Sequence, residues 1–210
     1  MPRARSPRQL TLARKSGWGG ARQGRGAQGK DGQPGPGVPH LRRAPVDSRN
    51  PVHVTLKVRR EVWSLRRKSS VEALQTAFLK QRHAGEARLR VVHFAILSNH
   101  LHLIVEAQGR TALSRGLQSL EIRMARALSA SMKRNGRVFA DRYHAHILKT
   151  PTEAGRARRY VLENAAIHDR RAGLRLLGPD GLTSAAMPDC PFPPRTWLLE
   201  SGYRRERLWG

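Results

Sequence analysis

The sequence predicts an α+β domain, in which a ferredoxin-like antiparallel sheet carries helices on one face and an appended C-terminal helix. Two observations predict this class. Apolar residues make up 39% of the 210 residues, and they cluster between residues 51 and 177, so a core can form there. Within that span the hydrophobic periodicity changes in the order strand, helix, strand, strand, helix, strand, which is the ferredoxin-like order.

The first strand and helix of this domain follow from local patterns. Residues 52–58 are predicted as a strand because apolar and polar side chains alternate there at the period of a half-buried strand. Ser69–Glu72 matches a capping box and predicts the start of a helix. Its apolar stripe holds Val71, Leu74, Phe78 and Gln81. Gly85 is predicted to end this helix.

A hairpin and a long helix are predicted next. Residues 89–97 and 100–106 are rich in strand-forming side chains, and Ser98–Asn99 between them is typical of a turn. An amphipathic helix is predicted from Thr111 to about Arg134, because long apolar side chains recur every three or four residues. These side chains are Leu113, Leu117, Leu120, Met124 and Leu128. Asn135–Gly136 is predicted to end this helix.

Residues 137–149 are predicted as a further strand, and the appended helix begins directly after it. The start signal is complete, with Thr150 as the cap, Pro151 at the first helical position and Glu153 closing a capping box. The helix is predicted to run to about His168.

Composition divides the chain into three segments. Residues 1–45 are mostly Arg, Gly, Gln and Pro. They are predicted to form a disordered basic arm, because too little apolar surface is present to offset the entropy of ordering. Either a phosphate-gripping arm or a solubilising tail fits this composition. Residues 51–177 form the folded domain, and residues 178–210 an irregular tail, in which Trp197–Leu199 either packs onto the body or stays loose.

The charge balance indicates the class of partner. Lys and Arg number 40 against 15 Asp and Glu, a formal charge of +25, and such an excess favours nucleic acid as the partner. The single Cys190 excludes a disulfide framework and a cysteine-based zinc site, and indicates a reducing, cytoplasmic location. No apolar run approaches the roughly 20 residues that cross a bilayer. The basic N-terminus lacks the apolar stretch of a secretory signal.

The residues most informative about chemistry are His100 and His102. Residues two apart on a strand point to the same face, so both imidazoles can converge on one divalent ion. Alone, this pattern is weak, and strand histidines hydrogen-bonded to their neighbours are its more frequent explanation. A second pair, His144 and His146, lies on the following predicted strand. The first pair is favoured because it sits beside a turn where a ligand can approach, whereas the second could line a nucleic-acid groove.

The appended helix offers groups that could complete such a site. Tyr160 and Asn164 are four residues apart and share a helix face, so a phenol and an amide oxygen can reach the same ion. Glu163 and His168 are rival ligands from nearby positions. From spacing alone, a core or surface aromatic is the more frequent role of a residue such as Tyr160.

Three segments together resemble a known family. Ser98–Val105 resembles the His-hydrophobic-His motif of single-tyrosine HUH transposases, whose usual form is Pro-Asn-His-Val-His-Leu-Leu-Val. Arg159–Asn164 resembles the helix of REP-associated tyrosine transposases and insertion-sequence-200-like enzymes, in which the nucleophilic tyrosine precedes Asn or Gln by four residues. Phe139–His144 is similar to the family's preceding strand, which favours a role for His144 outside the metal pair. The resemblance covers about residues 52–173.

The resemblance implies a metal-dependent single-stranded DNA endonuclease and strand transferase that acts in DNA transposition. A tyrosine hydroxyl has an ordinary pKa near 10 and needs a partner that favours the phenolate. Tyr160 would attack a phosphate in line, leaving a 3′-hydroxyl and a 5′-phosphotyrosine link. His100, His102 and Asn164 would hold the metal ion, Mg²⁺ or Mn²⁺.

Single-stranded or hairpin DNA is the implied partner, because a cleft between one helix and a sheet admits a single strand more readily than a stiff duplex. The candidate nucleic-acid contacts are Arg90, Arg115, Arg123, Arg142, His144 and Lys149. The implied location is a bacterial cytoplasm or nucleoid. Related enzymes act either as dimers that exchange the tyrosine helix or as monomers, so a homodimer stays open.

The chain departs from the family pattern at two places. Ser98 stands where proline is usual, and Ala165–Ala166 follows Asn164 where Pro-Val is common. Neither departure removes a reactive group. The alternative function is a non-catalytic basic nucleic-acid-binding protein, a domesticated or decayed relative of the transposases.

Overall fold

The computed structural model describes residues 45–83, 89–171 and 182–208, with side chains left out for residues 164–171 and 206–208. The predicted basic arm, apart from Pro45, and the predicted helix end at Gly85 therefore lie outside the described residues. Within these ranges, no helix combines the length and apolar character that a membrane crossing requires.

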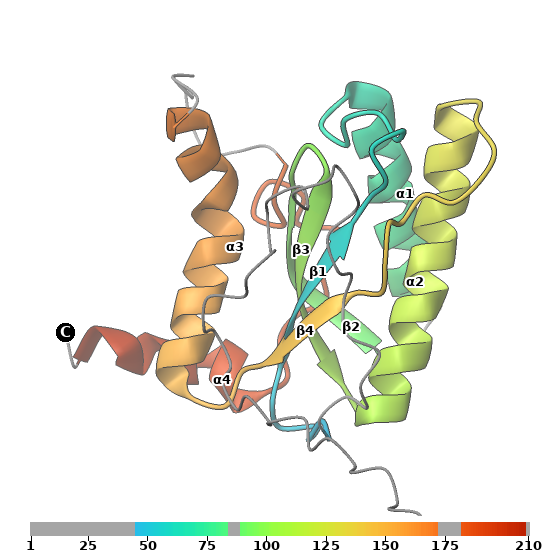
Figure 1. Ribbon diagram of the computed structural model, residues 1–210. Coiled ribbons are helices and arrows are strands. Elements are labelled where there is room, and N and C mark those ends of the chain that lie inside the picture. The colour runs from blue at the N-terminus through green and yellow to red at the C-terminus, as the bar shows by residue number, and fades with distance from the viewer. Residues whose placement is uncertain (1–44, 84–88, 172–181, 209–210) are drawn as a thin grey trace, which may run out of the picture. The chain divides into compact units, whose positions relative to one another are not determined.

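The first six elements follow the predicted order of strands and helices. They are β1 (Val52–Lys57), α1 (Lys68–His83), β2 (Leu89–Ile96), β3 (His100–Ala107), α2 (Arg110–Ser131) and β4 (His144–Ile147). They are followed by α3 (Pro151–Arg171), α4 (Trp197–Glu200) and the 3₁₀ helix η1 (Gly202–Leu208). The strands form one antiparallel sheet in the order β2-β3-β1-β4, with helices on both sides of it (Figure 1).

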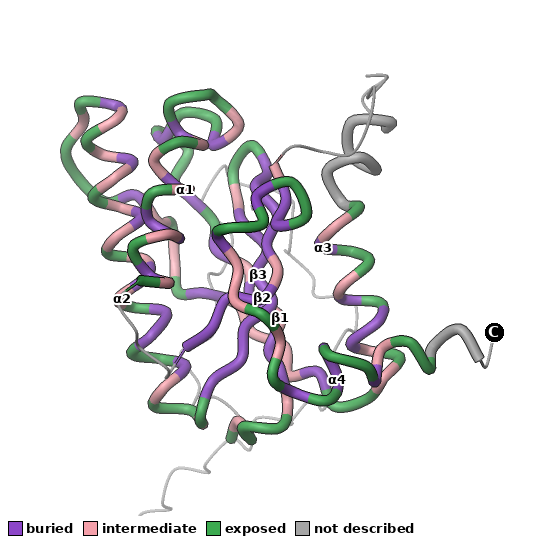
Figure 2. Tube along the Cα trace, turned by 180° about the vertical axis from the view of Figure 1, so that it is seen from behind, coloured by how far each residue is buried: buried purple, intermediate pink, exposed green. Residues whose placement is uncertain are grey.

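One face of the sheet is apolar and is covered by α1 and α2 (Figures 1 and 2). Val54 and Leu56 of β1 and Leu101 and Leu103 of β3 belong to this core and are at most 1% exposed. The predicted stripe of α2 also packs here, since its apolar side chains from Leu113 to Leu128 are buried. Burying each large apolar side chain contributes roughly 1.5–3 kcal/mol, so this face supplies most of the hydrophobic stabilisation.

The opposite face carries polar side chains and α3. In the strand register Thr55 lies opposite His102 and His144, and Lys57 lies opposite His100. Residues paired in this way project to the same side of a sheet. α3 is attached to this face through a smaller apolar cluster. The cluster consists of Val92, Ala95, Ile104, Leu148, Ala157, Val161 and Leu199.

The C-terminal segment covers the outer edge of β2. Backbone hydrogen bonds join residues 182–192 to β2, and Leu198 and Leu199 of α4 are buried. The bonds run from Ile96 N to Leu182 O, from Ser184 N to Phe94 O and from Phe192 N to Val91 O. Trp197–Leu199 therefore packs onto the body, and the covered edge is not open to pairing with another chain.

Two predicted element bounds are wrong. The strand predicted for residues 137–149 shortens to β4, with one isolated bridge between Phe139 and Val58. The reason is a turn before β4, where the Asp141 carboxylate accepts a hydrogen bond from the Arg142 N–H at 2.7 Å. α1 begins at Lys68 and not after a Ser69 cap, because the Val71 N–H donates to the Arg67 carbonyl at 2.9 Å and closes the first turn there.

The start of α3 is as predicted. Glu153 N–H donates to the Thr150 hydroxyl at 3.2 Å, and the Glu153 carboxylate accepts from the Thr150 N–H at 3.2 Å. This reciprocal pair is a capping box. It fixes where the helix begins, and therefore which of its residues face the sheet.

Candidate active site

His102 lies at the centre of a cluster on the polar face of the sheet. Its Nε2 is 3.1 Å from Nε2 of His100 and 3.4 Å from the hydroxyl of Tyr160. The His102 and Tyr160 rings are 5.0 Å apart between centroids and nearly perpendicular, at 76°. The phenol and both imidazoles predicted to share a site are thus brought together within one chain.

The packing of α3 explains the position of Tyr160. The capping box starts the helix at Pro151, and Tyr160 follows two and a half turns later. Ala157 and Val161 on the same helix are buried in the apolar cluster on the sheet. Tyr160 lies beside these anchors and is 43% exposed, so its hydroxyl reaches His102 while the ring stays open to a ligand.

The geometry of the histidine pair fits a metal ion. His100 Nδ1 donates a hydrogen bond to Asn99 Oδ1 at 2.7 Å, so in the neutral ring the Nε2 atom carries the lone pair. Two nitrogens 3.1 Å apart, each about 2.1 Å from an ion, subtend an angle of about 95° at it. This angle suits adjacent positions of an octahedral ion such as Mg²⁺.

For a metal ion, the described side chains at this place offer two imidazole nitrogens, those of His100 and His102. Among them, no group of three or more His, Cys, Asp or Glu residues is arranged to hold a metal ion. Glu163, one predicted rival, is exposed. The side chains of Asn164 and His168 lie outside the described residues. An ion held by two imidazoles leaves several positions for phosphate oxygens and water.

His53 and Thr55 support His102 and were not singled out from the sequence. His53 Nε2 and the Thr55 hydroxyl each lie 3.2 Å from His102 Nδ1. Such contacts to the far nitrogen orient a ligating imidazole. The alternation of residues 52–58 places both side chains on the polar face, but only the β1–β3 register shows that this face is shared with His102.

The electrostatic environment keeps His53 neutral. Burial first, and then the neighbouring His146 and His144, lower the pKa of His53 from 6.5 to about 4. A neutral His53 can both donate and accept a hydrogen bond. The second histidine pair lies on the same face, because His146 pairs with His53 and His144 pairs with Thr55. His146 Nε2 is 3.9 Å from the Glu153 carboxylate.

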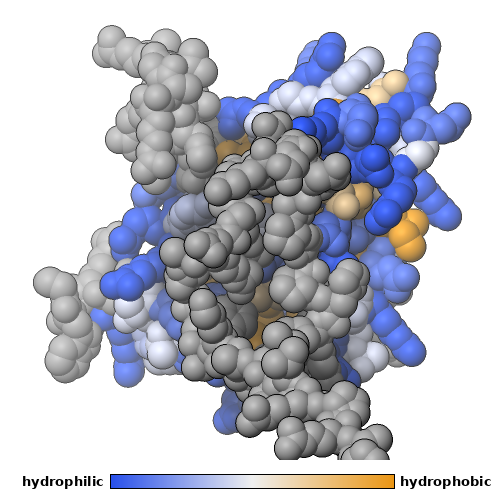
Figure 3. Space-filling view, in the orientation of Figure 1, coloured by the Kyte–Doolittle hydropathy of each residue, from blue (hydrophilic) through white to orange (hydrophobic). Residues whose placement is uncertain are grey.

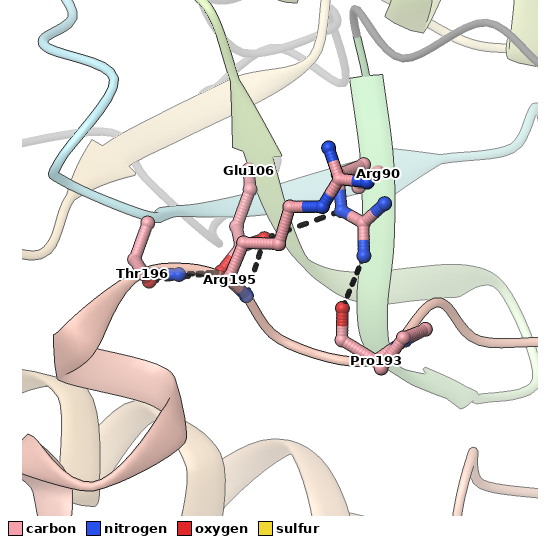
Figure 4. Close-up of polar contacts among 5 residues, drawn as sticks. All are labelled: Arg90, Glu106, Pro193, Arg195 and Thr196. Atoms are coloured by element: carbon pink, nitrogen blue, oxygen red, sulfur yellow. Dashed lines mark hydrogen bonds and ion pairs between the residues drawn. The ribbon is translucent and has the colours of Figure 1, made fainter.

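Arg90, predicted from the sequence as a nucleic-acid contact, is buried and bonded to other residues of the chain. Its side chain is 9% exposed, and its Nε lies 3.5 Å from the buried Glu106 carboxylate. It also donates to the Pro193 carbonyl (Figure 4), and its guanidinium lies over the Phe192 ring. The guanidinium is therefore committed to holding the C-terminal segment.

The other predicted contacts are divided between the two sides of the sheet. Arg115 and Arg123 lie on α2, across the sheet from Tyr160, and Arg123 donates to the Lys80 carbonyl of α1. Hydrophilic side chains dominate the visible surface around these helices (Figure 3). His144 lies on the polar face with the site, since it pairs with Thr55. Arg142 is exposed before β4, and Lys149 is exposed before α3.

A basic loop lies beside His100 and was also missed. The loop, residues 59–67, is attached to the turn before β3, because Leu65 N donates to Ser98 O at 2.8 Å. It contains an exposed Trp63, with the Arg67 guanidinium 4.5 Å from the ring. Its basic residues are Arg59, Arg60, Arg66 and Arg67. A composition of exposed cations around an aromatic ring is typical of single-strand binding surfaces.

Comparison with known proteins extends the fold assignment. The sequence matches no protein-family model and no curated protein. The structure is similar to a solved structure of a REP-associated tyrosine transposase bound to a REP hairpin, with a TM-score of 0.50 and 14% sequence identity. The match covers 62% of this chain and 74% of that one. At this identity the similarity shows a distantly related, transposase-like fold.

Proposed function

We propose that this chain is a metal-dependent enzyme that nicks and rejoins single-stranded DNA through a covalent 5′-phosphotyrosine link. One observation carries the proposal: the Tyr160 hydroxyl lies 3.4 Å from an imidazole nitrogen that is itself 3.1 Å from a second one. A nucleophile and two ligands for a Lewis acid at this spacing suit phosphoryl transfer. The fold similarity to a hairpin-bound transposase supports the same class of substrate.

His100 and His102 would hold the divalent ion, Mg²⁺ or Mn²⁺, which supplies Lewis-acid polarisation of a non-bridging phosphate oxygen when bound. Asn164 is the proposed third ligand, one turn beyond Tyr160. His53 and Thr55 hold His102 so that Nε2 faces Tyr160. Because Tyr160 and the histidines belong to one chain, the proposed site needs no second copy.

The proposed reaction exchanges one phosphate ester for another. Tyr160 Oη forms a bond to phosphorus while the bond from phosphorus to the 3′-oxygen breaks. The phenol proton passes to solvent, to which the ring is open, and the departing 3′-oxygen takes up a proton. A second 3′-hydroxyl can reverse the step and join new ends, so cleavage and strand transfer use the same residues.

The test is formation of a covalent adduct. Purified protein is incubated with Mn²⁺ and labelled single-stranded hairpin oligonucleotides with randomised flanks, and denaturing gels detect the product. We expect an adduct in the wild type, none in Tyr160→Phe, and an unchanged amount in Tyr143→Phe. An adduct that persists in Tyr160→Phe would refute the assignment.

The histidine pairs provide a second comparison in the same assay. His100→Ala and His102→Ala should abolish the adduct and weaken Mn²⁺ binding while leaving salt-sensitive DNA binding in place. Equal losses in His144→Ala and His146→Ala would show that the second pair holds the metal. DNA binding with no adduct under any condition would favour the alternative, a non-catalytic nucleic-acid-binding protein.

A further inference from the structure

A hollow lies at the end of the sheet opposite His100. Its volume is about 570 Å³, and its lining residues precede β1, begin β2, end β3, precede and begin α3, and form the start of α4. Antiparallel pairing sets its position, since Val52 pairs with Val105 at this end while Lys57 pairs with His100 at the other. α3 links the two places, because Pro151 lines the hollow and Tyr160 lies about 14 Å further along the helix.

The wall of the hollow carries an excess of positive charge. Arg49, Lys149 and Arg195 line it with exposed side chains. Arg49 is paired with Asp47 at 2.8 Å. In the described part of the chain, no carboxylate is recorded in an ion pair with Lys149 or Arg195. These two cations are therefore available to an anionic ligand.

The acidic residue in the wall does not offset this excess. Glu106 is 4% exposed, and its carboxylate accepts hydrogen bonds from the Arg195 N–H, the Thr196 N–H and the Thr196 hydroxyl (Figure 4). It also forms the ion pair with Arg90. The negative charge of Glu106 is thus compensated by Arg90 and by these hydrogen-bond donors. The guanidinium of Arg195 stands beside that of Arg90 (Figure 4), and this neighbouring positive charge, after burial, lowers the pKa of Arg90.

An exposed aromatic ring borders these cations. Trp197 is 49% exposed, and the Arg205 guanidinium lies 5.1 Å from its ring centroid. An indole at this exposure offers a face on which a base can stack. Two cations that can bind a phosphate, beside an aromatic ring on which a base can stack, match the phosphate and the base of a nucleotide.

We infer that the hollow is a nucleotide subsite, in which Lys149 and Arg195 hold a backbone phosphate and Trp197 stacks on the adjoining base. The ligand is one nucleotide of the single strand that flanks the phosphate at Tyr160, so the inference rests on the proposed function. A stacked strand advances 3.4 Å per nucleotide, and the spacing of about 14 Å along α3 corresponds to about four nucleotides or fewer.

The test measures affinity against flank length. Labelled hairpin oligonucleotides with flanks of zero to eight nucleotides on either side are titrated with the full chain by fluorescence anisotropy. The variants are Lys149→Gln/Arg195→Gln and Trp197→Ala. The matched controls are Lys80→Gln/Arg126→Gln and Ile122→Ala, which change exposed cationic and apolar side chains on α1 and α2.

We expect the pocket variants to lose about tenfold in affinity for long flanks on one side and nothing for the shortest flanks. Removing two phosphate contacts should also lower the salt slope by roughly 1.4, at about 0.7 per contact. Trp197→Phe should keep most of the affinity, which separates stacking from damage to α4. Equal losses in the controls, or losses independent of flank length, would overturn the inference.

The adduct assay separates this inference from the proposed function. If the wild type forms no adduct, the proposed function fails, while the anisotropy differences still report on the subsite. If adduct forms and affinity ignores both flank length and the pocket variants, only the subsite is wrong.

Discussion

The two faces of the sheet divide stability from chemistry. On β3, the neighbouring residues His102 and Leu103 point to opposite sides. Leu103 is fully buried against α1 and α2, whereas His102 contacts His53, Thr55, His100 and Tyr160. Because side chains alternate along a strand, residues on one face can change without disturbing the core that the other face stabilises.

The largest effects are expected from substituting His102 and Leu103, the two neighbours on β3. His102→Ala should lower the rate of adduct formation by at least about 100-fold, because a metal ligand is lost, with little change in the free energy of unfolding. Leu103→Ala should lower that free energy by about 2–5 kcal/mol, because it leaves a cavity in the core. Gel assays and urea titrations of both variants measure the two effects. A reversal of the two outcomes would contradict the division.

Removing a side chain that orients His102 should have a smaller effect. Thr55→Val removes the hydroxyl near His102 Nδ1 at almost constant volume. Loss of an orienting partner typically weakens metal binding by about 10- to 100-fold, which Mn²⁺ titration would measure. Thr76→Val is the control, since the Thr76 hydroxyl donates to the Glu72 carbonyl on α1. Equal changes in the two variants would exclude an orienting role for Thr55.

The fold was more predictable from the sequence than the site. Local patterns predicted the element order, the buried stripe of α2 and the capping box of α3, because each depends on neighbours in sequence. His100, His102 and Tyr160 could be selected because their segments resemble transposase motifs, whereas spacing alone was a weak signal. His53 and Thr55 could not, because their contact with His102 depends on strand register. The burial of Arg90 could not be predicted either, because its partner Glu106 lies on another strand and residues 192–193, which contact it, come from far along the chain.

The polar face should also make the fold sensitive to acid. Burial first, then the charge of Arg158, lower the pKa of His93 from 6.5 to about 4. In the unfolded chain His93 binds a proton below about pH 6.5, whereas in the folded chain it does so only below about pH 4. The contribution of His93 to the unfolding free energy therefore falls between pH 7 and pH 4 and levels off below. Near pH 5 this loss is up to about 2 kcal/mol, reduced by solvent screening at the partly exposed ring.

Two variants isolate the contribution of His93. His93→Asn should show a shallower loss of unfolding free energy from pH 7 to pH 5 than the wild type, measured by urea titration at each pH. His83→Asn, which changes an exposed residue of α1, should retain the wild-type slope. A wild-type slope in His93→Asn would contradict the assignment.

The smallest expected effect concerns the start of α3. Thr150→Ala removes one half of the capping box and should cost about 1 kcal/mol of unfolding free energy. Thr152→Ala, at an exposed position two residues later, should change the unfolding free energy little. Thermal melts of the two variants would measure the difference. No difference would mean that packing of α3 on the sheet, and not its cap, fixes the helix start.

The most direct test of the central claim is to identify the residue that carries the DNA. The chain has three tyrosines, Tyr143, Tyr160 and Tyr203. After reaction with Mn²⁺ and a single-stranded hairpin, nuclease and protease digestion followed by mass spectrometry would locate the nucleotide-bearing peptide. The account predicts a 5′-phosphate linked to Tyr160. A link to another residue, or a 3′-phosphate linkage, would contradict it.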